Sequence, residues 1–459
     1  MALAGIIMAA GQGTRMKSET PKVLHLVCGL PMVEHVGRAM QKAGVNRPVV
    51  IVGHGAEKVK ESLDSHTYAF ATQSEQLGTG HAVLMAKEAL ASYEGCVLVA
   101  PGDTPLLDGE ALSSLVAKHR ETGALCTVAA FRLSDPTGYG RVITDAMGRP
   151  LRIVEQKDCS TEEAKVNLVN SSVYCFDSKT LFALLPRLGT ANAQGEYYLT
   201  DVLSEIVKMG GVIAVVEYSD PDLFMGVNDR WSLAQAGKIF QTRILRHHAL
   251  NGVTIVDPST TFIEADVKIG QDTVIEPMTS LAGATTIGAN CVIGPQTKIQ
   301  SSQIGDNVEV LMSYLKAASM ADGSRCGPFA HLRPGAQLGE RVKIGNFVEV
   351  KKSIIGDGAQ VNHLSYIGDA TIGTKTNIGA GTITCNYDGF RKHETTIGSY
   401  CFVGSNSTLV APVTLQDGVF IAAGSVITKD VSADALALGR AQQVEKTEWA
   451  KRWREKNQS

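Results

Sequence analysis

The chain begins with an apolar run that breaks into a glycine-rich turn. Leu3–Ile7 are apolar, and Met8–Met16 read MAAGQGTRM. Such a run indicates a buried parallel strand, and the small residues after it let backbone N–H groups approach a phosphate closely. Arg15, and Lys22 after a proline, add two cations, which suit a triphosphate better than a dinucleotide, and the spacing is not GxGxxG. A tight turn without a ligand remains the alternative for this stretch alone.

Polar residues near other apolar runs strengthen the nucleotide interpretation. Asp103 ends the run CVLVAPGD, at the usual place of a magnesium carboxylate in an open α/β sheet. Residues 73–82, QSEQLGTGHA, offer two amide side chains that can read a base edge, followed by a second glycine-rich turn. The motifs GYGR, VEQKD, VNSSVY and GVNDR supply further candidates, which are Gly140, Glu155, Asn170 and Asn228.

The elements that must position these residues fall into two halves. Up to about residue 229, short apolar runs alternate with amphipathic stretches, which predicts an α/β domain with a mostly parallel sheet. Residues 229–248 contain no proline, carry apolar residues at helical spacing and are followed by Asn251-Gly252, so we expect one linker helix. We therefore expect a first domain at 1–229, a linker helix at 230–250 and a second domain with a C-terminal helix at 251–459.

In the second half an aliphatic residue recurs at every sixth position. One run is Ile269, Ile275, Leu281, Ile287, Ile293 and Ile299, a second is Leu338, Ile344 and Val350, and a third is Ile397, Val403, Leu409, Leu415, Ile421 and Ile427. This period predicts a three-sided parallel β-helix in which each aliphatic residue points inward, and it leaves the handedness open. The period breaks at Cys385–Thr396, and because repeat proteins carry function on insertions, this loop is a candidate site.

Composition excludes several classes of function. The net charge of −3 over 459 residues gives no basic face for nucleic acid. Nine scattered cysteines without a CxxC pair fit neither a disulfide framework nor a zinc site, which favours a reducing cytoplasm. We expect no signal peptide, and no apolar stretch approaches the roughly 18 residues of a membrane span.

The ordered motifs resemble one enzyme family along essentially the whole chain. MAAGQGTRM, PKVLH, QSEQLGTGHA, GDTPL, GYGR, VEQKD, GEYYLTD and GVNDR are similar to motifs of the sugar-nucleotide pyrophosphorylases. Together with the hexapeptide half they resemble the bifunctional N-acetylglucosamine-1-phosphate uridyltransferases and glucosamine-1-phosphate acetyltransferases. The resemblance implies a Rossmann-like domain followed by a left-handed β-helix, and synthesis of UDP-N-acetylglucosamine for peptidoglycan and lipopolysaccharide. Gln12 and Pro101 depart from the family, which commonly has lysine and a bulky aromatic residue there.

By this resemblance the first domain joins UTP to N-acetylglucosamine 1-phosphate and releases pyrophosphate. A sugar-phosphate oxygen attacks the α-phosphorus in line, so positioning and charge neutralisation carry the catalysis. The resemblance implies Arg15 and Lys22 as catalytic residues, and Asp103 and Asn228 as Mg²⁺ ligands. It assigns the UDP-sugar contacts to Met8, Ala9, Ala10, Gly11, Lys22, Gln73, Gly78, Thr79, Asp103, Gly140, Glu155, Asn170 and Asn228.

Acetyl transfer from acetyl-CoA to glucosamine 1-phosphate needs a base, because only the free amine attacks the thioester. The repeat phase leaves His363 outside the coil, and the resemblance implies that it is this base, ahead of His331 and His393. Asn386, on the interrupting loop, would polarise the thioester carbonyl. The resemblance assigns the sugar phosphate to Arg333, Lys351, Tyr366 and Asn377, and acetyl-CoA to Ala380, Asn386, Tyr387, Ser405, Ala423 and Arg440. It also implies a homotrimer in which Asn386 completes the site of an adjacent chain.

Two other functions compete with this interpretation. A nucleotidyltransferase with a non-catalytic β-helix stalk would have no need for His363 together with Lys351, Tyr366 and Asn386. A non-enzymatic hexapeptide scaffold would leave Asp103 and the MAAGQGTRM loop without a role.

Overall fold

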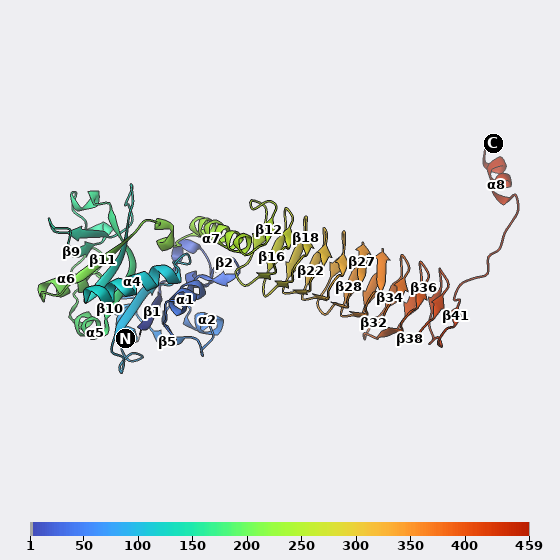
Figure 1. Ribbon diagram of the computed structural model, residues 1–459, viewed down its shortest axis with the longest axis horizontal. Coiled ribbons are helices and arrows are strands. Elements are labelled where there is room, and N and C mark those ends of the chain that lie inside the picture. Colours follow the sequence, from blue (N-terminus) through green and yellow to red (C-terminus); the bar gives the residue numbers. More distant parts are fainter. Residues whose placement is uncertain (1–2, 459) are drawn as a thin grey trace. The chain divides into compact units, whose positions relative to one another are not determined.

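The computed structural model describes residues 3–458, which form two compact units (Figure 1). One unit ends at Thr242 and the other begins at Arg243, so the boundary lies within helix α7 (Arg230–Leu250). Helix α8 (Trp449–Asn457) follows the repeats near the C-terminal end. Among the described residues, none of the helices has the length and apolar character needed to cross a bilayer.

The first unit is an α/β domain with helices on both faces of one sheet. Its strands are β1 (Leu3–Ala9), β2 (Leu26–Val27), β3 (Leu30–Pro31), β4 (Val49–Val52), β5 (Ala69–Thr72), β6 (Cys96–Pro101), β7 (Cys126–Arg132), β8 (Arg141–Thr144), β9 (Pro150–Val154), β10 (Leu168–Asp177) and β11 (Ile213–Tyr218). Its helices before α7 are α1 (Met32–Lys42), α2 (Ala56–Ser62), α3 (Thr79–Leu84), α4 (Gly109–Thr122), α5 (Ser178–Leu184) and α6 (Asp201–Lys208).

The sheet runs in the order β11-β7-β10-β6-β1-β4-β5, with β8 and β9 attached at β10 and with β2 and β3 forming a separate pair. Strand β10 is antiparallel to β6 and β7, whereas the other neighbours on this path are parallel. Neighbouring residues of a strand face opposite sides, so Ile6 packs in one hydrophobic core and Ile7 in the other. Because β1, β4, β5 and β6 are parallel, the loops after them meet at one edge of the sheet.

The second unit is a parallel β-helix with three faces. The first face consists of β12 (Thr254–Ile255), β15 (Val274–Ile275), β18 (Val292–Ile293), β21 (Glu309–Val310), β24 (Arg325–Cys326), β27 (Lys343–Asn346), β30 (Gln360–His363), β33 (Asn377–Ile378), β36 (Phe402–Val403), β39 (Phe420–Ile421) and β41 (Leu436–Ala437). The second face consists of β13 (Phe262–Ile263), β16 (Ser280–Ala282), β19 (Lys298–Gln300), β22 (Tyr314–Lys316), β25 (His331–Leu332), β28 (Glu349–Lys351), β31 (Tyr366–Gly368), β34 (Ile383–Cys385), β37 (Thr408–Val410) and β40 (Val426–Ile427). The third face consists of β14 (Lys268–Ile269), β17 (Thr286–Ile287), β20 (Gln303–Ile304), β23 (Ser319–Met320), β26 (Gln337–Leu338), β29 (Ile354–Ile355), β32 (Ala370–Ile372), β35 (Thr395–Ile397) and β38 (Val413–Leu415).

The six-residue period explains this architecture. Ile344, Val361 and Ile378 are register partners on successive rungs of the first face, and each is at most 2% exposed. Burying one such aliphatic side chain contributes roughly 1.5–3 kcal/mol, and each rung contacts only its neighbours. The prediction of an α/β domain followed by a β-helix of hexapeptide repeats is therefore confirmed.

Candidate active sites

The glycine-rich loop after β1 is fixed to the neighbouring strand ends. The backbone N–H of Gly102 donates to the carbonyl of Met8 at 2.8 Å, and that of His54 donates to the carbonyl of Ala10 at 3.3 Å. Met8 and Ala9 end β1, and Ala10 and Gly11 begin the loop. The predicted phosphate contacts therefore lie beside the end of β6, which leads into Asp103.

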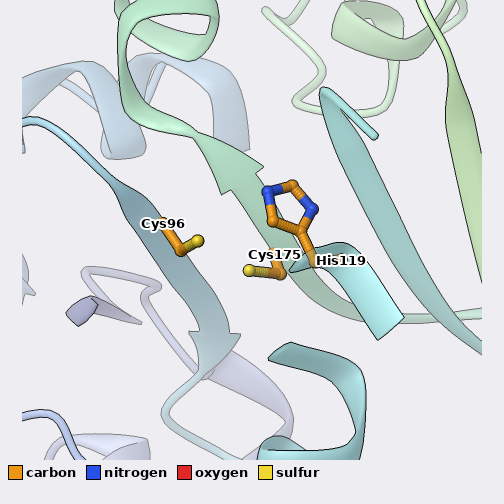
Figure 2. Close-up of side chains that lie close together, drawn as sticks. All are labelled: Cys96, His119 and Cys175. Carbon is orange, nitrogen blue, oxygen red and sulfur yellow. The ribbon is translucent and has the colours of Figure 1, made fainter. Parts of the chain in front are cut away.

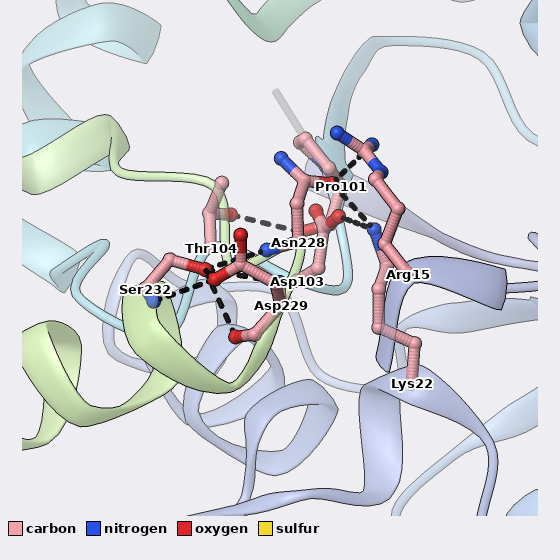
Figure 3. Close-up of polar contacts among 8 residues, drawn as sticks. All are labelled: Arg15, Lys22, Pro101, Asp103, Thr104, Asn228, Asp229 and Ser232. Atoms are coloured by element: carbon pink, nitrogen blue, oxygen red, sulfur yellow. Dashed lines mark hydrogen bonds and ion pairs between the residues drawn. The ribbon is translucent and has the colours of Figure 1, made fainter. Parts of the chain in front are cut away.

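Two cationic side chains and two side-chain oxygens that could bind a metal converge at this edge of the sheet (Figure 3). The Nζ of Lys22 contacts the carboxylate of Asp103 and lies 3.2 Å from Oδ1 of Asn228. The Nη2 of Arg15 donates to the same Asn228 oxygen at 2.9 Å. The side chains of Lys22 and Asp103 are only 16% and 19% exposed, so their charges are partly shielded from water. The structure thus brings together four predicted residues that are up to 213 positions apart in the sequence.

Backbone hydrogen bonds hold Asp103 and Asn228 side by side. The N–H of Val227 donates to the carbonyl of Asp103 at 2.9 Å, which places Asn228 next to that carboxylate. Ser232 Oγ accepts from the backbone N–H of Asn228 at 3.0 Å. Arg230, which begins α7, donates from Nε to the carbonyl of Met16 at 3.3 Å. The start of α7 therefore supports both the metal-ligand candidates and the phosphate loop.

This arrangement fits a divalent cation. The oxygens of Asp103 and Asn228 both contact one ammonium group, so they already converge on a point of positive charge. A carboxylate and an amide oxygen are hard donors, which suit Mg²⁺ when substrate phosphates and water complete the coordination.

The absence of a side chain at Gly13 leaves room for the side chain of Lys22. Gly13 has a φ of 62°, and a Cβ built on it would lie 2.6 Å from Cβ of Lys22. We expect Gly13→Ala to displace Lys22 and to lower kcat/KM for the predicted uridyl transfer by roughly 10- to 100-fold, because misplacement by about 1 Å has an effect of this size. Steady-state kinetics would measure this loss. Gly189→Ala is the matched control, since a Cβ there meets no atom within 4 Å and no positive φ is required. An unchanged kcat/KM for Gly13→Ala would contradict a role for this close contact.

The predicted base-reading residues lie on one turn after β5. Gln73 is 3% exposed, and its Nε2 lies 3.1 Å from the carbonyl of Gly78 and 3.0 Å from Nδ1 of His81. Because the amide nitrogen of Gln73 contacts other groups of the protein, its amide oxygen is left to accept a hydrogen bond from a bound ligand. Thr79 accepts a hydrogen bond from the backbone N–H of Leu199 at 3.0 Å, which ties this turn to the segment before α6.

The three residues predicted for the sugar also lie together. The backbone N–H of Asn170 donates to the carbonyl of Gly140 at 2.9 Å. A Cβ on Gly140 would lie 3.3 Å from a carboxylate oxygen of Glu155, so a glycine leaves room for that group. Burial raises the pKa of Glu155, and Thr200 donates a hydrogen bond to its Oε1 at 3.3 Å. The three residues therefore form a small cluster of carbonyl, carboxylate and amide groups.

A second candidate site begins at the corner between the first and second faces of the β-helix, here called the first corner. His363 is exposed there at the end of β30 and is the register partner of Asn346 on the preceding rung. The Nδ1 of His363 lies 2.6 Å from Oδ1 of Asn346. Because a carbonyl oxygen only accepts, Nδ1 carries the proton and Nε2 is left with a lone pair, as a general base requires.

The first corner continues as a column of small residues. Backbone hydrogen bonds between consecutive rungs link Gly381 to His363, Asn406 to Ala380 and Gly424 to Ser405. Ala380, Ser405 and Ala423 therefore occupy the same position on the three rungs after His363, spaced by about 4.8 Å each. Arg440 donates from Nη1 to the carbonyl of Ala423 at 2.7 Å. Four residues predicted for acetyl-CoA thus line one edge that starts at the predicted base.

Three of the residues predicted for the sugar phosphate gather on the second face. Tyr366 is the register partner of Glu349, and Lys351 is the partner of Gly368. Arg333 forms an ion pair from Nη1 to Oε1 of Glu349 at 2.6 Å. These contacts place two cations and a phenol on adjacent rungs, which suits an anionic phosphate.

Two further predictions fall elsewhere on the coil. Asn377 begins β33 on the first face, so its own chain does not bring it beside Arg333. Asn386 follows β34 at the corner between the second and third faces, here called the second corner, and donates from Nδ2 to the carboxylate of Asp369. The loop after Asn386 is exposed, with Tyr387 at 57% and Phe390 at 93%. Asn386 and Tyr387 therefore lie at a different corner from His363 of the same chain.

Three supporting residues were not predicted from the sequence. His81 orients Gln73, Arg230 holds the phosphate loop, and Asn346 fixes the tautomer of His363. Asn346 could have been found from the repeat, because it stands one rung before His363. The other two act across folded elements, and no local motif indicates such contacts.

Comparisons with known proteins agree with this geometry. Residues 5–194 match the MobA-like NTP transferase domain, and residues 266–301 and 394–429 match the bacterial transferase hexapeptide repeats, which identifies the β-helix as the left-handed hexapeptide type. The chain is 51% identical over 447 residues to a Bifunctional protein GlmU of Staphylococcus haemolyticus, which covers 97% of this chain and 99% of that protein. The proteins of the same name from Latilactobacillus sakei and Geobacillus thermodenitrificans are 50% and 46% identical. They cover 97% and 99% of this chain, and 96% and 99% of their own lengths. The chain therefore belongs to the family of the bifunctional GlmU proteins.

Proposed function

We propose that this chain makes UDP-N-acetylglucosamine in two steps at two separate sites. The second unit transfers the acetyl group of acetyl-CoA to the amine of glucosamine 1-phosphate. The first unit transfers the uridylyl group of UTP to the resulting N-acetylglucosamine 1-phosphate and releases pyrophosphate. Membership of the family supports both activities, and nine cysteines without a disulfide among the described residues support a reducing compartment such as the cytoplasm.

The proposal for the first reaction rests on one observation, the convergence of four side chains, which are those of Lys22, Arg15, Asp103 and Asn228. Mg²⁺ held by Asp103 and Asn228 would neutralise charge on the triphosphate. Arg15 and Lys22 contact the phosphates, and backbone N–H groups after β1 stabilise the charge that develops at the α-phosphorus. Gln73 selects the base, and the polar cluster of Gly140, Glu155 and Asn170 orients the sugar so that its phosphate oxygen attacks in line.

The second reaction rests on His363 and the column that follows it. Nε2 of His363 takes a proton from the sugar ammonium, and the free amine attacks the thioester carbonyl. The C–S bond then breaks, and coenzyme A leaves as the thiol with the second proton of the amine. Arg333, Lys351 and Tyr366 hold the sugar phosphate. The small residues Ala380, Ser405 and Ala423 leave an edge along which the extended pantetheine arm of coenzyme A can lie, because larger side chains would project into its path.

The positions of the predicted acetyl-transfer residues at two different corners of the coil favour a homotrimer. Asn386 and Tyr387 lie at the second corner, whereas His363 lies at the first, so one chain does not place both beside the same thioester. If three parallel coils pack around a common axis, the first corner of one chain can meet the second corner of its neighbour. The one Asn386 N–H that is not donated to Asp369 is then available to the thioester oxygen of the adjacent chain.

A direct test supplies the substrates together and singly. With glucosamine 1-phosphate, acetyl-CoA, UTP and Mg²⁺ we expect UDP-N-acetylglucosamine, coenzyme A and pyrophosphate. Without UTP the chain should still release coenzyme A, and with N-acetylglucosamine 1-phosphate plus UTP it should still release pyrophosphate. Release of pyrophosphate without any acetyl transfer would instead favour a nucleotidyltransferase whose β-helix is a stalk.

A further inference from the structure

Two cysteines and a histidine meet inside the first unit, apart from the sites described above. Cys96 begins β6, Cys175 lies on β10 and His119 lies in the last turn of α4. Each offers one ligand atom, and these atoms lie within 4.8 Å of one another. Figure 2 shows the three side chains converging between the strands and the helix. All three are buried, with at most 4% of each residue exposed.

The register of the sheet explains why these side chains converge. Strand β10 lies between β6 and β7. Asp177 is paired with Cys96, so Cys175, two residues away along β10, faces the same side of the sheet. Thr127 of β7 is paired with Cys175 and faces this side too. Its Oγ1 lies 3.0 Å from Nδ1 of His119. This contact holds the imidazole through Nδ1 and leaves Nε2 as the nitrogen that can bind a metal.

We propose that Cys96, His119 and Cys175 bind one Zn²⁺ ion. Two sulfurs and a nitrogen are soft ligands that select zinc over magnesium. On binding, the ion forms two Zn–S bonds and one Zn–N bond, the thiol protons of Cys96 and Cys175 pass to solvent, and a water takes the fourth position. With Zn–S bonds of about 2.3 Å, the sulfurs of a tetrahedral site are about 3.8 Å apart, so the ligand atoms, which lie within 4.8 Å of one another, need to approach by at most about 1 Å.

This zinc site is distinct from the magnesium site. Cys96 stands at the start of β6, whereas Asp103 follows its end, so the length of the strand separates the two. The hard oxygens of Asp103 and Asn228 and the soft ligands of the cluster select different ions. A zinc ion here would join β6, β10 and α4. It would stabilise the folded first unit, because the unfolded chain does not present the three ligands together.

Cobalt titration of the full-length chain tests this proposal. Co²⁺ replaces Zn²⁺ at thiolate sites and gives sulfur-to-cobalt charge-transfer absorption, which oxygen ligands do not give. We expect one Co²⁺ per chain with this absorption, loss of the absorption when Zn²⁺ is added, and a higher melting temperature with Zn²⁺. Cys175→Ser and His119→Gln should each weaken binding at least ~100-fold, and Thr127→Val by about 10- to 100-fold through its contact with the histidine.

Cys126→Ser is the matched control. Cys126 is fully buried on β7 of the same sheet, but it packs in the core on the opposite face. This variant removes a buried thiol and should leave the cobalt absorption unchanged. Absence of charge-transfer absorption in the reduced wild-type protein would overturn the proposal. Absorption that survives both Cys96→Ser and Cys175→Ser would also overturn it, as would a Cys96–Cys175 disulfide found by peptide mapping of the purified chain.

Discussion

Asp103→Ala is expected to lower kcat/KM for uridyl transfer by about 10³-fold or more while acetyl transfer stays near the wild-type value. The carboxylate is the one charged ligand candidate for the metal, and it also contacts Lys22. A bound metal supplies several kcal/mol of charge stabilisation in such reactions, and each ~1.4 kcal/mol corresponds to a tenfold change in rate. Separate assays of pyrophosphate and coenzyme A release measure the two activities in the same preparation.

A second variant at this position separates the effect of charge from that of shape. Asp103→Asn keeps an oxygen near Lys22 but removes the negative charge, so it should lose nearly as much uridyl transfer as Asp103→Ala. Asp145→Ala serves as the control. Asp145 also forms an ion pair, with 2.7 Å between its Oδ2 and Nε of Arg149, but this pair lies on the β8–β9 turn and the arginine is exposed. An equal loss of both activities in Asp103→Ala would mean that Asp103 acts on the fold of the whole chain.

Much of the first site could be predicted because its residues follow strands. Asp103 and the MAAGQGTRM loop each follow a short apolar run, and parallel strands bring their carboxyl ends to one edge. The contact between Val227 and Asp103 could not be predicted in this way. It joins segments more than a hundred residues apart through backbone atoms, and backbone hydrogen bonds leave no preference for residue type in the sequence.

The repeat unit was more predictable, since its hydrophobic period fixes which residues point inward. The period placed Val361 inside and His363 outside, and the structure confirms both positions. The interrupting loop at 385–396 was also found from the broken period. The period does not state which corner each outward residue occupies, because that depends on where each rung turns. The separation of His363 from Asn386 therefore emerged only from the folded coil.

The second large effect is expected at His363, the predicted base for acetyl transfer. His363→Ala is expected to lower acetyl transfer by about 10²- to 10⁴-fold, the usual cost of losing a general base, and to leave uridyl transfer intact. Asn346→Ala should cause a smaller loss of acetyl transfer, because Nδ1 of His363 would lose the acceptor that fixes its tautomer. Uridyl transfer in the same preparations is the internal control for folding of the first unit.

Mixing two inactive variants tests whether the acetyl-transfer site is shared between chains. We expect His363→Ala and Asn386→Ala chains, co-expressed with different tags and purified through both, to recover acetyl transfer. A site is intact when its histidine comes from an Asn386→Ala chain and its asparagine from a His363→Ala neighbour, and a cyclic trimer that contains both variants has one such site among its three. Trimers that combine His363→Ala with the doubly substituted chain should stay inactive, since none of their sites contains His363 from one chain and Asn386 from the next. If doubly tagged His363→Ala/Asn386→Ala trimers also stay inactive, each chain builds its own site, and the two corners must be joined by a movement of the 385–396 loop instead.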